Sequence, residues 1–117
     1  MFTIYPTDDE RVIELEIKGD VTKEDYALLE DAIKEKLKEM EHVNLLCRIT
    51  EFSGITAQAV LKDFKLFIKH YSNIRKMAVI STKDWIEWMT KLGAVLPVEM
   101  KHFELDDYDQ AQRWVKE

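Results

Sequence analysis

The chain has few of the residues that brace or interrupt small folds: it contains one cysteine, three glycines and two prolines in 117 residues. Because Cys47 is the single cysteine, the sequence excludes an intrachain disulfide and a cysteine-pair zinc site. No apolar run approaches the roughly 20 residues that a membrane-spanning helix needs. The N-terminus also lacks the basic region followed by an apolar stretch that is typical of a signal peptide. We therefore expect a cytoplasmic protein without a transmembrane segment.

Basic residues are fewer than acidic ones. Lys and Arg number 17 against 23 Asp and Glu, which gives a net charge of −6. Binding to a nucleic-acid backbone needs clustered cations that displace counterions, so we expect no nucleic-acid partner. Apolar residues make up 46% of the chain, a proportion typical of globular proteins. At this length we expect a single domain over residues 1–117 with one hydrophobic core.

The chain does contain a regular alternation of strand-like and helix-like segments. Period-two apolar patterns predict strands, and apolar residues spaced by three and four predict helices. The predicted strands span residues 2–6, 11–19, 43–51, 76–81 and 98–105. The predicted helices begin at Thr22, at about Thr56, at Ser81 and at Asp107. This order predicts an α/β fold with a five-stranded, mainly parallel mixed sheet, in which the first strand is antiparallel at the edge.

The starts of two helices have recognisable polar residues. Thr22 is followed three residues later by Asp25, an arrangement similar to a capping box. The last helix is expected to begin at Asp107, with Gln110 three residues later, shortly after the final strand ends.

Polar residues on one side of two strands predict how helices cover the sheet. Within residues 11–19, apolar positions alternate with charged ones: Ile13, Leu15 and Ile17 with Glu14, Glu16 and Lys18. Strands that are covered on both faces are usually continuous apolar runs instead. We therefore expect helices mostly on one face, with the other face partly open or covered by a partner.

Four stretches carry a resemblance to a known family: IKGDVTKEDY, LLCRITEFSGITAQAVLKDFKLFIKHY, KMAVISTKDWIEW and VEMKHFELDDYDQAQRWV. Their landmarks are small, aromatic or ionisable residues: Gly54, Asp63, His70, Ala78, Trp85, Phe103, Ala111 and Trp114. In this order and spacing, the chain resembles the SpoIIAA-like family. That family is a branch of the STAS-type domains and is sometimes grouped with CRAL-TRIO lipid-binding domains. The resemblance implies a (βα) superhelix and brings no catalytic chemistry, so we expect no enzymatic activity and no cofactor.

The loop after the third strand is the first candidate site, at Glu51, Ser53, Gly54 and Thr56. In many STAS-type regulators a kinase phosphorylates the residue before a glycine here, and Ser53 takes that place when aligned on Gly54. A phosphate would then lie near a helix start, where backbone N–H groups favour negative charge. In the other interpretation, Ser53 and Gly54 make the turn and help to cap the helix. Glu51 and Phe52 replace the aspartate and serine of the STAS pattern, which favours the turn.

Two further surfaces are candidate binding regions. The helix from about Thr56 has a basic face with an outward leucine, made of Lys62, Lys65, Leu66 and Lys69. This face is either a docking surface for an acidic partner or anionic head group, or an ordinary solvated surface. An apolar group near the third helix consists of Phe67, Trp85, Trp88 and Met89. Aromatic residues at helical spacing are typical of a core and also of a ligand pocket.

Catalytic and metal-binding patterns are absent from the sequence. None of the three histidines, His42, His70 and His102, has a second ligand three or four residues away in a pattern that indicates a metal site, so we expect none. Cys47 lies within a strand and is expected to be a buried structural thiol. The leading hypothesis is a non-enzymatic STAS-like binding or regulatory module that acts through residues 51–56 and the second helix. The alternative is a small apolar-ligand or lipid-binding domain with its pocket near the third helix, and in either case we expect a homodimer.

Overall fold

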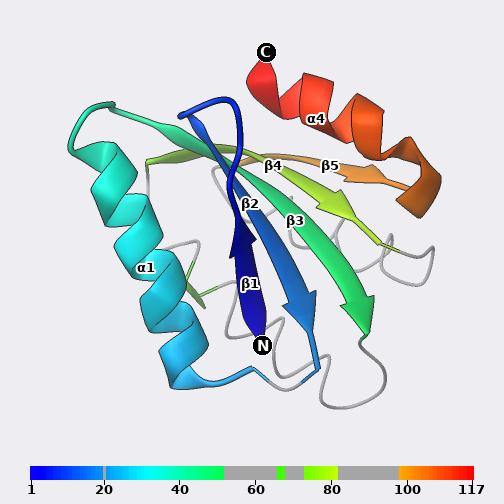
Figure 1. Cartoon of the computed structure of the whole chain (residues 1–117). Helices are drawn as coiled ribbons and strands as arrows, with labels where there is room; N and C mark the ends of the chain where they lie inside the picture. The colour runs from blue at the N-terminus through cyan, green and yellow to red at the C-terminus, as the bar shows by residue number, and fades with distance from the viewer. Residues whose placement is uncertain (20, 52–65, 68–72, 82–97) are drawn as a thin grey trace.

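The computed structural model describes residues 1–19, 21–51, 66–67, 73–81 and 98–117. Figure 1 shows the strands and helices that these residues form. In chain order they are β1 (Phe2–Tyr5), β2 (Val12–Lys18), α1 (Lys23–Leu37), β3 (Val43–Glu51), β4 (Ile74–Ile80), β5 (Glu99–Phe103), the 3-10 turn η2 (Leu105–Asp107) and α4 (Tyr108–Lys116).

The five strands form one sheet in the order β1-β2-β3-β4-β5. β1 pairs with β2 in the antiparallel direction, whereas β2, β3, β4 and β5 are parallel to one another. The predicted α/β class, the five-stranded mixed sheet and the antiparallel edge strand are therefore confirmed. The helices predicted after the second and last strands are α1 and α4. The helices predicted at about 56–71 and from Ser81 fall mainly outside the described residues, apart from Leu66 and Phe67, which are helical.

α1 and α4 lie on opposite faces of the sheet (Figure 1). On the α1 face, Leu29 and Ile33 of the helix pack against apolar strand residues that include Leu15, Leu45 and Met77. The face that we expected to be partly open carries α4, which lies over β3, β4 and β5. There Ala111 and Val115 of the helix pack against Val12, Leu46, Ala78, Ile80 and Phe103.

The two helices begin differently. Thr22 and Asp25 form the predicted capping box, with the Thr22 side chain accepting from the Asp25 N–H and the Asp25 carboxylate accepting from the Thr22 N–H. Just before it, Gly19 has φ of 63°, a left-handed conformation that glycine adopts without strain. Asp107 does precede α4, but its side chain makes no capping hydrogen bond. Its backbone N–H donates instead to the Glu104 carbonyl in the preceding turn.

Candidate functional site

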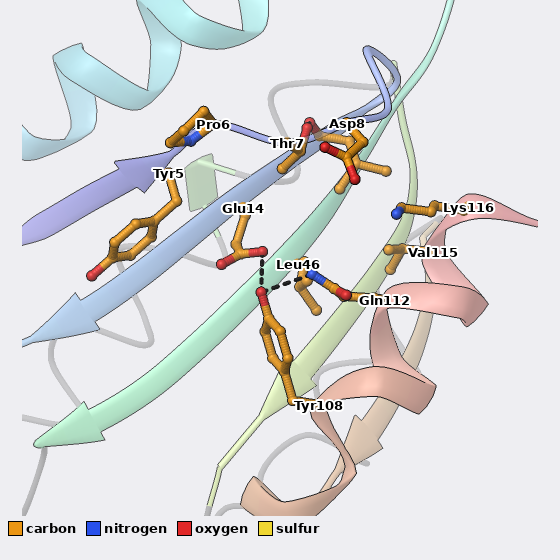
Figure 2. A pocket seen from close by; sticks show the side chains of 11 residues that line it. Tyr5, Pro6, Thr7, Asp8, Glu14, Leu46, Tyr108, Gln112, Val115 and Lys116 are labelled. Atoms are coloured by element: carbon orange, nitrogen blue, oxygen red, sulfur yellow. Dashed lines mark hydrogen bonds between the residues drawn. The ribbon is translucent and has the colours of Figure 1, made fainter.

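A partly buried hydrogen-bond chain joins the last helix to the second strand. The Tyr108 hydroxyl donates to Glu14 Oε1 at 2.5 Å, and the Gln112 amide donates to the Tyr108 oxygen at 2.8 Å (Figure 2). Glu14 is only 6% exposed, so the expectation of a wet face on this strand is wrong at that residue. The reason is that α4 and its tyrosine cover the carboxylate and supply the hydrogen bond that a buried acid needs.

Arg48 of β3 supplies the positive charge next to this chain. Its Nη2 lies 3.6 Å from Glu14 Oε2, and its Nε lies 3.9 Å from Glu16 Oε2. The guanidinium also lies between two aromatic rings, 5.4 Å from the centre of Tyr5 and 5.2 Å from that of Tyr108. Such cation–π contacts favour a planar guanidinium. Arg48 thus compensates two carboxylates from one position, although its buried Nε has no hydrogen-bond partner among the described residues.

The electrostatic environment of Tyr108 differs from that of an ordinary tyrosine. Burial and the hydrogen bond to Glu14 raise the pKa of Tyr108 from 10.0 to about 12. The phenol therefore stays protonated and remains a donor to Glu14 across the physiological range. Tyr5 completes the arrangement on the other side of Arg48, because its hydroxyl donates to Glu16 Oε1 at 3.2 Å.

A cavity of about 280 Å³ adjoins this chain, between the β1–β2 turn and α4 (Figure 2). The turn contributes polar groups at the rim, and Val12 of β2 and Leu46 of β3 contribute an apolar floor. Its lining residues are Tyr5, Pro6, Thr7, Asp8, Val12, Glu14, Leu46, Tyr108, Gln112, Val115 and Lys116. We call this space the α4 cavity.

The helix that forms one wall of the α4 cavity is held at its C-terminal end. Asn44 Nδ2 donates to the Val115 carbonyl at 2.6 Å, Arg11 Nη2 donates to the Lys116 carbonyl at 3.1 Å, and Lys76 Nζ donates to the Glu117 carbonyl at 3.2 Å. These donors satisfy carbonyl groups that a helix end leaves without intrahelical partners, and the two cations also suit the negative end of the helix dipole. The wall is therefore fixed relative to β3 and β4.

The predicted loop site is described only at its first residue. Glu51 ends β3 and pairs in register with Lys18 of β2. Ser53, Gly54 and Thr56 lie outside the described residues, so the choice between switch and turn stays a prediction.

The other two predicted surfaces are described at one residue each. Leu66 is 59% exposed, in agreement with its expected outward position, whereas Lys62, Lys65 and Lys69 are outside the described part of the chain. Phe67 packs on the α1 face, where its ring lies 5.6 Å from that of Tyr26. Trp85, Trp88 and Met89 are outside the described residues, so the apolar pocket near the third helix stays a prediction.

The structure describes the surroundings of Cys47 and His102, which were considered for thiol and metal chemistry. Cys47 is buried as predicted, and burial raises the pKa of its thiol to about 12, which disfavours the reactive thiolate. Nε2 of His102 in β5 lies 3.0 Å from Oγ of Ser81, the residue that follows β4. Within the described ranges, no three His, Cys, Asp or Glu side chains are grouped so that they could hold a metal ion. No helix in those ranges is long and apolar enough to cross a membrane.

Sequence analysis did not identify the cluster of Tyr5, Glu14, Glu16, Arg48 and Tyr108. A signal was present, because opposite charges occur on the same face of two strands that are consecutive in the sheet. Glu16 and Arg48 are direct neighbours in the β2–β3 register. What could not be read from the pattern is Tyr108, which is 94 residues away from Glu14 in the chain.

Comparisons with known proteins agree with this architecture. The family model described as SpoIIAA-like matches residues 12–116. A crystal structure of an uncharacterized protein of the DUF3478 family with a SpoIIAA-like fold, from Shewanella loihica PV-4, is similar with a TM-score of 0.69 and 26% sequence identity. The similarity covers 98% of this chain and 92% of that chain. A search of curated proteins finds no match, and the comparisons do not support the relation to CRAL-TRIO domains. This chain belongs to the SpoIIAA-like family.

Proposed function

We propose that the chain is a non-enzymatic binding or regulatory module of the STAS type, which recognises a protein partner through residues 51–56. The observation that supports this proposal is the position of Glu51. It ends the middle strand of the sheet, on the edge where the parallel strands have their carboxyl ends. In open α/β sheets, ligands bind outside the carboxyl ends of the strands. The segment that follows Glu51 therefore leaves the sheet at the edge where recognition is expected.

The strand that carries this segment is a rigid support. Leu45, Cys47 and Ile49 of β3 are buried against the α1 face, and Leu46 is buried on the α4 face. Next to Glu51, the backbone of Lys18 is held by the N-terminal amino group, which donates to its carbonyl at 2.6 Å. A loop that is displayed by a well-packed strand suits recognition, because the scaffold limits the entropy lost on binding.

The second helix is the other part of the proposed contact surface. Leu66 is exposed, and large exposed apolar side chains are enriched where proteins meet partners, provided that they belong to a patch. The neighbouring residues Lys62, Lys65 and Lys69 are proposed to complete such a patch for an acidic partner.

We also propose that the chain forms a homodimer. Sedimentation at micromolar concentration tests this directly, because a sample that contains only the 13.9-kDa monomer would contradict it.

The loop is tested by partner capture with matched variants of the full chain. Glu51→Lys reverses a charge at the proposed edge, and Glu39→Lys makes the same change at an exposed residue after α1. We expect Glu51→Lys to reduce capture of a defined partner at least about tenfold, which corresponds to roughly 1.4 kcal/mol. Glu39→Lys should capture like the unmodified chain. Equal capture by both variants would contradict recognition through this loop.

The same assay separates the two interpretations of Ser53. If Ser53 is a turn residue, Ser53→Ala and Ser53→Asp should both capture the partner normally, and this is the outcome that we expect. If it is a phosphorylation switch, Ser53→Asp should differ sharply from Ser53→Ala, because phosphate adds about −1.5 to −2 charges at one point.

Native mass spectrometry of the purified chain tests the lipid-binding alternative, which requires retained lipid.

A further inference from the structure

We infer that the α4 cavity is a binding site for a small aliphatic amine in its protonated form. This inference goes beyond the proposed function, because the cavity lies at the amino-terminal edge of the parallel strands. Val12 is the first residue of β2, and the turn at Thr7 and Asp8 immediately precedes that strand. Residues 51–56 follow the carboxyl end of β3. The two sites can therefore be changed independently.

The size of the cavity limits the ligand to a few heavy atoms. Its volume of about 280 Å³ equals the space of roughly nine liquid waters at about 30 Å³ each. Val12, Leu46 and Val115 provide apolar side chains that suit a short hydrocarbon body. The polar lining distinguishes it from a dry packing defect, because empty cavities in proteins are apolar.

The hydroxyl groups that line the cavity have already used their hydrogens. Tyr108 donates to Glu14, and Tyr5 donates to Glu16. The Thr7 hydroxyl lies within hydrogen-bond distance of the backbone carbonyls of Asp9 and Val12, at 2.8 and 2.9 Å. Each of these hydroxyls therefore has no hydrogen left to donate, and the Tyr5 and Thr7 oxygens offer lone pairs to a ligand, whereas the Tyr108 oxygen already accepts one hydrogen bond from Gln112. The lining is rich in acceptors, so it complements a ligand that brings N–H donors.

The charges of the lining favour the same kind of ligand. Asp8 and Glu14 contribute two carboxylates to the lining and Lys116 contributes one ammonium, while Arg48 lies 3.6 Å from Glu14 and compensates its charge. The Glu14 side chain is 8% exposed and is therefore buried, whereas Asp8 is exposed at the rim of the cavity. Asp8 forms no ion pair with another described residue. A positively charged donor would thus find at the rim a carboxylate that no described cation compensates, within a chain whose net charge is −6.

An inorganic cation fits these residues less well than an organic one. Calcium takes about six to eight oxygen ligands, several of them carboxylates. Over the described ranges, no group of three acidic, histidine or cysteine side chains is arranged for a metal. An alkylammonium needs fewer ligands, and its hydrocarbon part can cover the apolar floor.

The test is an NMR titration of the full chain with n-butylammonium, with 1-butanol and butyrate as size-matched neutral and anionic probes. We expect saturable shifts of the backbone amides of Thr7, Asp8, Val12 and Gln112 with the amine. The alcohol and butyrate should bind at least about tenfold more weakly, because a charge-assisted hydrogen bond is lost. Equal affinity for the amine and the alcohol would overturn the inference.

Two variants and a control locate the site. Asp8→Asn and Glu14→Gln should each weaken amine binding about tenfold or more. Asp8 is in an exposed turn, so its variant should fold even if Glu14→Gln disturbs the hydrogen bond from Tyr108. Asp106→Asn removes an equal charge from an exposed residue of η2 and should leave the affinity unchanged. Non-saturable shifts spread over the acidic surface, or equal losses in Asp8→Asn and Asp106→Asn, would show unspecific attraction and overturn the site.

Discussion

The two faces of the sheet use alternate residues of the same strands but differ in their chemistry. On the α1 face, β2 presents Ile13, Leu15 and Ile17, and all three are buried in an apolar core. On the α4 face, the same strand presents Glu14 and Glu16, which are compensated by Arg48. Apolar contacts need no particular partner, whereas a buried charge needs a specific one at a specific distance. The α1 face of β2 therefore contributes only to the apolar core, whereas its α4 face positions polar groups beside a cavity and an apolar cluster.

The two helices are also held in opposite ways. α1 is fixed at its start by the capping box, and Asp25 additionally accepts a hydrogen bond from the Phe2 N–H of β1 at 3.1 Å. α4 has no side-chain cap at its start and is held at its end by Asn44, Arg11 and Lys76. These three residues belong to different segments: Asn44 to β3, Lys76 to β4, and Arg11 to the turn before β2. The backbone of α4 is thus hydrogen-bonded to other segments at its end, whereas α1 has a capping box and a contact with β1 at its start.

The largest expected effect compares adjacent residues of β3 on the two faces. Leu45→Ala should cost about 2–5 kcal/mol of unfolding free energy, because it leaves a void in a dry core. Leu46→Ala enlarges the α4 cavity, where water can enter, so we expect a smaller cost of roughly 2 kcal/mol from lost apolar burial. Urea unfolding of both variants measures the difference. A Leu46→Ala cost equal to or above that of Leu45→Ala would remove the distinction between a dry face and a wet one.

Removal of the positive charge on the α4 face should have the next largest effect. Arg48→Met keeps an apolar stem between the two tyrosine rings but leaves Glu14 without its cation. We expect a loss of about 2 kcal/mol, below the usual range for a fully buried pair, because Arg48 is 30% exposed. The double variant Arg48→Met with Glu14→Gln should recover part of the loss in chemical unfolding, since the uncompensated charge is gone. No recovery would mean that Arg48 acts through packing alone.

Tyr108→Phe tests the hydrogen bond between Tyr108 of α4 and Glu14 of β2. It removes the donor to Glu14 and should cost about 1–2 kcal/mol. Because the folded pKa of Tyr108 is raised to about 12, its contribution to stability is complete below pH 10 and is lost as pH rises towards 12. Stability measured from pH 9 to 12 should therefore fall more steeply in the unmodified chain than in Tyr108→Phe. Parallel pH curves for the two proteins would contradict the raised pKa.

Helix capping gives a matched comparison of α1 and α4. Thr22→Ala should cost about 1 kcal/mol, because it removes the capping hydrogen bond to the Asp25 N–H. Asp107→Ala at the start of α4 should cost only a few tenths of a kcal/mol, since its side chain makes no capping bond and contributes through the helix dipole alone. Thermal unfolding of the two variants provides the measurement. A larger cost for Asp107→Ala would show that α4 depends on its start after all.

The smallest expected effect concerns the pair at the rim of the α4 face. Asp9 accepts two side-chain hydrogen bonds from Arg11, and these bonds lower the pKa of Asp9 from 3.8 to about 2. Its contribution is therefore present above pH 3.8 and is lost as pH falls towards 2. Since Arg11 is largely exposed, Asp9→Asn should cost less than about 1 kcal/mol at neutral pH and less still in high salt. A salt-independent loss above that limit would indicate a role in holding α4 through Arg11.

Local patterns of the sequence by themselves determined the α/β class, the strand ranges and the capping box at Thr22. Period-two alternation in β2 and the three-residue spacing of Thr22 and Asp25 depend only on residues that are close in the chain. For the same reason, the burial of Cys47 followed from its place in an apolar run. The proposed loop at residues 51–56 is also an inference from local sequence, and it rests on the alignment at Gly54.

Only the tertiary structure decided which charges are buried and where the α4 cavity lies. Glu14 was expected to be wet because its alternation with apolar residues is the same as that of an exposed strand face. It is buried because Tyr108, from the opposite end of the chain, packs over it, and because the strand register places Arg48 beside Glu16. The period of a strand states which side chains share a face, but it does not state what covers that face. That depends on contacts between distant segments, whose partners cannot be read from spacing.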